Sequence, residues 1–167
     1  MLRPTILFVD DEPHLLESIK TMLRKERYRI LTATSGEEAL ALFAKAEQDI
    51  DVIVSDERMP AMQGSVLLTT VRERFPDVVR VLLTGQASIA AAVRAVNDAH
   101  VHMFLEKPIA PDALKRALAD ALGARRSVEV PLEGDEKEAR ASLEAIHPGI
   151  TRVQRDSRGA IVLDLEE

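Results

Sequence analysis

Five polar residues in this chain each follow a short apolar run, and their types suit chemistry on a phosphoryl group. They are Asp10, Asp11, Asp56, Thr84 and Lys107. A carboxylate can attack a phosphoryl donor only if the repulsion between the two anions is neutralised. Three carboxylates form an oxygen-rich site suited to Mg²⁺, which would bridge the nucleophile and the phosphoryl oxygens. A lysine can hold the remaining charge, and a hydroxyl can donate a hydrogen bond to the transferred group. These residue types therefore predict phosphoryl transfer to a carboxylate.

The elements that must position these residues show clear periodicity over the first 123 residues. Short apolar runs, typical of buried strands, alternate there with stretches whose apolar residues have helical spacing. Strands are expected at 5–9, 29–33, 52–55, 79–83 and 102–105, and helices at 15–25, 35–46, 64–75, 87–97 and 111–122. Ser35 and Glu38 have the spacing of a capping box at the start of the second helix. Gly123 stands where a C-cap glycine would end the fifth helix.

The alternation of five strands with five helices predicts an α/β fold with a doubly wound, five-stranded parallel sheet. Helices then cover both faces of the sheet, because the crossovers between parallel strands are right-handed. Ligands of such folds bind beyond the carboxyl ends of the strands. We therefore expect Asp10, Asp56 and Lys107 to lie close together at that edge.

The pattern changes after Gly123. We expect a domain at 1–123, a linker at 124–135 and a small extension at 136–167, made of a short helix and a β-hairpin. An extension of this size cannot bury much apolar surface by itself. It should pack on the larger domain or on a second copy of the chain in a two-fold dimer.

Composition narrows the classes of function. The 167 residues carry a net charge of −6, and aromatic residues make up only 3%. This balance argues against sequence-independent nucleic-acid binding, which needs a basic face. No cysteine is present, which excludes disulfides and thiolate metal sites. The N-terminus reads as neither a signal peptide nor a membrane span, so a cytoplasmic location is expected.

Four segments of the chain resemble one known family. ILFVDDE, VIVSDERMP, VLLTG and FLEKP, in this order and spacing, are similar to the receiver domains of two-component response regulators, in particular the subgroup with SDxRMP and LLTG motifs. The resemblance covers residues 5 to about 122 and implies a flavodoxin-like fold. It also implies a signalling phosphoacceptor rather than an enzyme with a separate substrate. A sensor histidine kinase or histidine phosphotransfer protein would donate the phosphoryl group, and phosphorylation would switch a protein-interaction surface.

The resemblance assigns a role to each residue of the metal site. Asp56 would be the phosphoacceptor and a ligand of Mg²⁺. Asp11 would bind the metal directly, and Asp10 would act mainly through a bound water. The backbone carbonyl of Arg58 would complete the ligands from the protein.

The resemblance also implies a switch and a control of signal lifetime. Thr84 and Lys107 would bind the phosphoryl oxygens, and a cis peptide bond before Pro108 would aim the lysine inward. Phe104 would move inward when Thr84 turns toward the phosphoryl group. Arg58 and Gln86 would flank the route of the hydrolytic water, so we expect slow self-dephosphorylation.

Two other functions remain open at this stage. The first is a DNA-binding transcriptional regulator that uses the extension, with Arg152, Arg155 and Arg158 as its only support. Residues 124–167 hold 7 basic and 10 acidic side chains, a net charge of −3, which argues against it. The second is an adaptor that works without phosphorylation, which the intact acidic site disfavours. The sequence does not identify the downstream partner.

Overall fold

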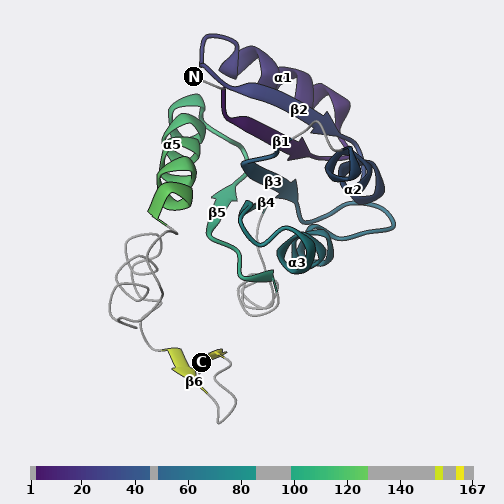
Figure 1. Ribbon diagram of the computed structural model, residues 1–167, viewed down its shortest axis with the longest axis vertical. Helices are drawn as coiled ribbons and strands as arrows, with labels where there is room; N and C mark the ends of the chain where they lie inside the picture. Colours follow the sequence, from purple (N-terminus) through teal and green to yellow (C-terminus); the bar gives the residue numbers. More distant parts are fainter. Residues whose placement is uncertain (1–2, 46–48, 86–98, 128–152, 156–160, 164–167) are drawn as a thin grey trace. The chain divides into compact units, whose positions relative to one another are not determined.

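The structure is a computed structural model that describes residues 3–45, 49–85, 99–127, 153–155 and 161–163 (Figure 1). The chain divides into two compact units, Met1–Val128 and Glu129–Glu167. Several expectations lie outside the described residues: the helix at 87–97, the short helix of the extension, the linker from residue 128 on, and the positions of Gln86, Arg152 and Arg158. No helix in the described part of the chain is long and apolar enough to cross a membrane.

The larger unit contains a five-stranded parallel sheet with the strand order β2-β1-β3-β4-β5. The strands are β1 (Thr5–Val9), β2 (Arg29–Ala33), β3 (Val52–Asp56), β4 (Val79–Thr84) and β5 (Met103–Glu106). The described helices are α1 (Pro13–Leu23), α2 (Gly36–Ala44), α3 (Gly64–Arg74) and α5 (Pro111–Ser127). The chain starts at β1, winds outward to β2, and then returns across β1 to β3. This order confirms the predicted doubly wound fold.

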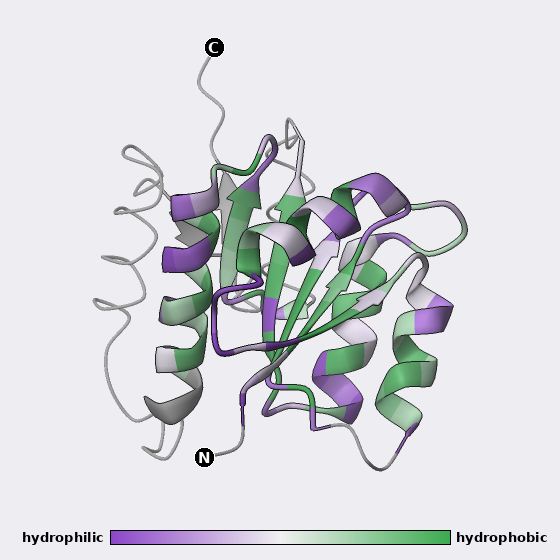
Figure 2. Cartoon of the chain, turned by 90° about the horizontal axis from the view of Figure 1, so that it is seen from above, coloured by the Kyte–Doolittle hydropathy of each residue, from purple (hydrophilic) through white to green (hydrophobic). Residues whose placement is uncertain are grey.

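Helices cover both faces of the sheet. Figure 1 shows α1 and α5 on one face and α2 and α3 on the other. Successive residues of β1 alternate between the two faces, so Leu7 and Val9 belong to one core cluster and Ile6 and Phe8 to the other. Every residue of β1 and β3 is buried. Figure 2 shows these strands as apolar ribbons between the helices. Continuous apolar runs therefore indicate strands covered on both sides.

The start of α2 contains one of the two hydrogen bonds of the predicted capping box. The backbone N–H of Glu38 donates to Ser35 Oγ at 3.1 Å, as expected. The Glu38 carboxylate, however, does not reach back to Ser35. It accepts hydrogen bonds from the backbone N–H and the hydroxyl of Thr34, at 2.6 and 2.9 Å. Thr34, the residue before Ser35, thus provides two further hydrogen bonds that fix the start of this helix.

Helix α5 does not end at Gly123, and that prediction is wrong. The helix continues to Ser127, and Gly123 does not adopt the left-handed conformation of a C-cap glycine. A glycine inside a helix costs about 1 kcal/mol relative to alanine, which the good helix formers Ala124, Arg125 and Arg126 can offset. The first residues of the expected linker therefore belong to α5.

The smaller unit contains two strands that pair with each other. β6 (Val153–Arg155) and β7 (Ile161–Leu163) are antiparallel, with Val153 opposite Leu163 and Arg155 opposite Ile161. We expect the two hairpin strands at 150–154 and 160–165. β7 lies within the second range, whereas β6 overlaps the first and extends one residue beyond it.

Candidate functional site

Three carboxylates meet at the carboxyl edge of the sheet. Asp10 and Asp11 directly follow β1, and Asp56 is the last residue of β3, which pairs with β1. One oxygen of each side chain lies within 4.8 Å of the others. Asp10 and Asp56 are only 1% and 5% exposed, whereas Asp11 is open to solvent. Clustered carboxylates with one solvent-facing side are suited to Mg²⁺, which prefers hard oxygen ligands and keeps several waters.

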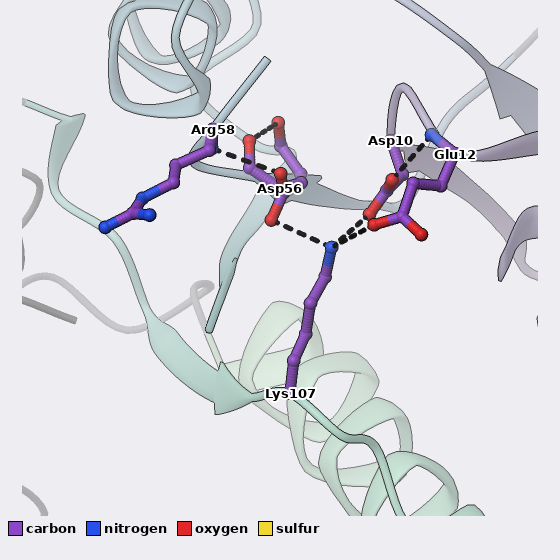
Figure 3. Close-up of polar contacts among 6 residues, drawn as sticks. Asp10, Glu12, Asp56, Arg58 and Lys107 are labelled. Atoms are coloured by element: carbon purple, nitrogen blue, oxygen red, sulfur yellow. Dashed lines mark hydrogen bonds and ion pairs between the residues drawn. The ribbon is translucent and has the colours of Figure 1, made fainter. Parts of the chain in front are cut away.

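The Lys107 ammonium lies between the carboxylates of Asp10 and Asp56 (Figure 3). Its Nζ is 2.7 Å from Asp10 Oδ2 and 3.1 Å from Asp56 Oδ1, with Glu12 Oε1 further away at 3.9 Å. Lys107 directly follows β5, and its backbone N–H donates to the carbonyl of Thr84 at 2.9 Å. The Lys107–Pro108 peptide bond is cis. The ends of β1 and β3 therefore place their carboxylates around the ammonium group of the residue that follows β5.

Burial and charge act in opposite directions on the ionisable groups of this site. Burial raises the pKa of Asp56, and the neighbouring Lys107 offsets only part of that rise. Burial alone would lower the pKa of Lys107, but hydrogen bonds and charge interactions with Asp10 and Asp56 raise it. Lys107 thus stays charged. A buried carboxylate with a raised pKa and a cation beside it is a typical functional group rather than a surface acid.

The loop after β3 contributes a backbone contact to Asp56. The N–H of Arg58 donates to Asp56 Oδ2 at 3.1 Å, so the two carboxylate oxygens have different partners. The side chain of Arg58 is exposed, and in Figure 3 its guanidinium points away from the carboxylate. Arg58 therefore contacts the site through its backbone, and covering a phosphoryl group would require another rotamer.

Thr84 and Phe104 lie on the two strands next to β3. Thr84 is the last residue of β4 and is partly buried. Phe104 pairs in register with Leu82 of β4 and is partly buried against the core cluster on the side of α2 and α3. Within the described part of the chain, the residues predicted for the acidic site and for the switch thus all lie at or near the carboxyl edge.

Sequence reasoning missed two residues that shape this site. Glu57, next to Asp56, directs its carboxylate to Ser65 at the start of α3, with contacts of 2.8 and 3.0 Å. Gly64 packs so closely on β3 that a Cβ there would lie 2.1 Å from the backbone oxygen of Asp56. The signal for Gly64 was a glycine at the first position of a predicted helix. Nothing in the sequence pairs Glu57 with a residue eight positions later.

Comparison with known proteins decides the family. The response regulator receiver domain matches residues 6–119 of the chain, well over half of its length. The chain belongs to the response regulator receiver family. The receiver is 36% identical over 121 residues to the hydrogenase transcriptional regulatory protein HoxA of Cupriavidus necator, covering 72% of this chain and 24% of that protein. It is 32% identical over 162 residues to the alginate biosynthesis transcriptional regulatory protein AlgB of Pseudomonas aeruginosa, covering 95% of this chain and 35% of that protein.

Solved structures agree with this assignment. The signal receiver domain of an HD domain-containing protein from Pseudomonas fluorescens Pf-5 matches with a TM-score of 0.72 and 30% identity, covering 75% of this chain and 99% of that one. A CheY-like receiver domain protein from Methanospirillum hungatei JF-1 matches with a TM-score of 0.71 and 27% identity, covering 75% and 98%. The receiver spans only about a quarter to a third of the length of the curated relatives named above.

Proposed function

We propose that Asp56 is the phosphoacceptor and that the phosphoryl group comes from a phosphohistidine on a sensor histidine kinase or a histidine phosphotransfer protein. The observation that carries this proposal is the position of the Asp56 carboxylate, buried at the end of β3 between Lys107 and the acidic pair after β1. In the transfer, the P–N bond of the donor breaks and a bond forms between phosphorus and a carboxylate oxygen of Asp56. The leaving imidazole takes up a proton.

The residues at this edge fit a magnesium ion as the cofactor of the transfer. Asp10, Asp11 and Asp56 would hold it, together with the backbone carbonyl of Arg58. The ion supplies positive charge that offsets the repulsion between the carboxylates and the incoming anion. Lys107, already bound to Asp56, is placed to hold an oxygen of the transferred group. A cytoplasmic setting, where kinase and magnesium are both present, is part of the same proposal.

Phosphorylation would change a protein-interaction surface through Thr84 and Phe104. The Thr84 hydroxyl would turn toward the phosphoryl group, and Phe104, which is only partly buried, would move into the space that is left. A ligand shifts such an equilibrium only through contacts that differ between the two states. Thr84→Ala should therefore still accept the phosphoryl group but lose the accompanying change in partner binding. Tuning of the signal lifetime by Arg58 and Gln86 stays a prediction.

Intact-mass measurement after incubation with a small phosphodonor and Mg²⁺ tests the phosphoacceptor. The wild-type chain should gain the mass of a single phosphoryl group, and chelation of the metal should prevent this gain. Asp56→Asn should remain unmodified, whereas the control Asp120→Asn, on the exposed side of α5, should be modified like the wild type. A phosphoryl group on Asp56→Asn would refute the assignment.

A further inference from the structure

Helix α3 begins without a cap of its own. Its N-cap residue, Gln63, makes no side-chain hydrogen bond to the helix, and the first turn holds no acidic residue. The first backbone N–H groups of a helix have no partner within it, and the helix dipole makes this end partly positive. The start of α3 therefore needs an anionic acceptor from elsewhere in the chain.

Glu57 provides that acceptor from the residue next to the phosphoacceptor. Its Oε2 accepts the backbone N–H of Ser65 at 2.8 Å, and its Oε1 accepts the Ser65 hydroxyl at 3.0 Å. Its backbone carbonyl accepts the N–H of Gly64 at 3.1 Å. Glu57 thus binds α3 through both its side chain and its main chain, and its carboxylate is used there rather than in the acidic cluster.

These bonds close residues 57–64 into a ring. On the other side, the N–H of Glu57 donates to the carbonyl of Leu83 at 3.0 Å, which ties the ring to β4. Arg58 follows Glu57 directly and is fixed by its own N–H contact to Asp56 Oδ2. The backbone of Arg58 is therefore held in two ways, by its own N–H contact to Asp56 and by the bonds that tie the preceding residue, Glu57, to Ser65.

We infer that Glu57 and Ser65 are positioning residues for the metal ion. They hold the loop after β3 so that the carbonyl of Arg58 is in place before the ion binds. Neither side chain touches the ion, and both act through the backbone of the ring. This inference rests on the proposed function, because the carbonyl of Arg58 matters only if Mg²⁺ binds at this edge.

A pure helix cap and a positioning pair predict different measurements. Loss of a cap lowers the free energy of unfolding and leaves the affinity for the ion unchanged. Loss of a positioning contact weakens Mg²⁺ binding, because the loop must be ordered when the ion binds. Substitution of groups that orient metal ligands typically weakens metal binding 10- to 100-fold.

The test is calorimetric titration of the full chain with Mg²⁺ alone, in the wild type and in Glu57→Ala, Glu57→Gln and Ser65→Ala. Glu57→Ala should raise the dissociation constant about ten-fold, the low end of that range because only one ligand is affected. Ser65→Ala should raise it less, because the backbone N–H of residue 65 still donates to Glu57. Glu73→Ala, which removes an exposed glutamate from the same helix, is the matched control and should leave it unchanged.

The rate of phosphorylation by a small phosphodonor provides a second readout. The Mg²⁺ concentration that gives half of the maximal rate should rise in parallel with the dissociation constant, while the rate at saturating Mg²⁺ recovers. If Glu57→Ala does not fold, Glu57→Gln and Ser65→Ala decide the question. Dissociation constants equal to the wild type in every folded variant, with reduced stability, would overturn this inference and leave the proposed function intact. A wild-type chain that binds no Mg²⁺ would overturn both.

Discussion

Lys107 holds together two buried carboxylates that would otherwise repel each other. Its ammonium contacts Asp10 and Asp56, and the Lys107 side chain itself is 20% exposed. Removing one partner from a buried ionic group leaves the others uncompensated, which costs more than the intact interaction gains. In the protein without metal, Lys107 is thus a structural counterion, in addition to the role that we propose for it toward the phosphoryl oxygens.

Lys107→Met should destabilise the metal-free protein by about 1–3 kcal/mol, because two buried carboxylates lose their cation. Mg²⁺ should restore part of this loss, since the divalent ion neutralises the same groups. Urea denaturation with and without Mg²⁺ measures both effects. Lys115→Met is the control. Lys115 forms an ion pair with Glu26 at 3.1 Å, and its own side chain is 40% exposed. The loss of stability in this variant should therefore stay within about 1 kcal/mol. An equal loss with and without Mg²⁺ in Lys107→Met would contradict this account.

The residues of the acidic site were predictable for a specific reason. Asp10, Asp56 and Lys107 each follow a strand that is apolar enough to be recognised, and parallel strands bring their carboxyl ends to one edge. The contact between Glu57 and Ser65 was not predictable in this way. It depends on the angle at which α3 leaves the loop after β3, and local periodicity carries no information about that angle.

At the scale of elements, the start of α3 and the end of α5 show how the surroundings of a glycine decide its role. A Cβ at Gly64 would meet the backbone of Asp56, whereas a Cβ at Gly123 would meet nothing within 4 Å. Sequence alone marked Gly123 as the structural glycine, because it stood where a helix was expected to end. The close approach of α3 to β3 exists only in the folded chain.

Gly64→Ala should destabilise the protein by at least about 1–3 kcal/mol, the usual cost of overpacking, because rigid backbone rather than a flexible side chain opposes the new methyl group. Gly123→Ala should instead stabilise it by about 0.5–1 kcal/mol, since alanine favours the interior of α5. Thermal and urea denaturation of both variants provide the comparison. A neutral Gly64→Ala would show that α3 can move away from β3 without cost.

The amino ends of β4 and β5 are joined by a neutral histidine. The backbone N–H of Arg80 donates to His102 Nδ1 at 3.1 Å, and the N–H of His102 donates to the carbonyl of Arg80 at 2.8 Å. Burial, followed by the charge of Arg80, lowers the pKa of His102 to about 4 from its ordinary value of 6.5. Protonated His102 could not accept the hydrogen bond from Arg80.

This pKa predicts a loss of stability in mild acid. The unfolded chain binds more protons at this residue than the folded chain, so the stabilisation is complete above pH 6.5 and is lost as the pH falls toward about 4. The loss should be modest, because His102 keeps solvent exposure that screens the charge. Urea midpoints between pH 7 and pH 5 should fall more steeply in the wild type than in His102→Asn, whose amide oxygen accepts without titrating. His14→Asn, at an exposed position of α1, should follow the wild type. Parallel curves for all three proteins would remove His102 as the cause.

At the scale of the whole molecule, the position of the domain boundary matters for any dissection. The first compact unit extends to Val128 and includes all of α5. Our expectation of a boundary at 123 followed from reading Gly123 as a C-cap. A cut at 123 would remove the last turn of α5, so the dissection belongs after Val128.

Truncation after Val128 should leave a receiver that folds and is phosphorylated on Asp56 like the full chain, because the sheet, both core clusters and the acidic site lie within that unit. If the extension joins two copies of the chain, the truncated form should also be more monomeric. Light scattering on both forms decides this point. If the full and the truncated chain have the same oligomeric state, the extension is excluded as a dimer element.

The contact between Lys107 and Asp10 joins residues 97 positions apart in the chain, and this distance has a consequence during protein synthesis. The ribosome releases β1 and β3 long before β5, so the nascent chain carries Asp10 and Asp56 while it still lacks their cation. Contacts this distant in sequence form late, because the entropy of closing so long a loop must first be overcome. The site thus becomes complete only when the last strand joins the sheet, so a nascent chain without β5 lacks the arrangement on which the proposed phosphoryl transfer depends.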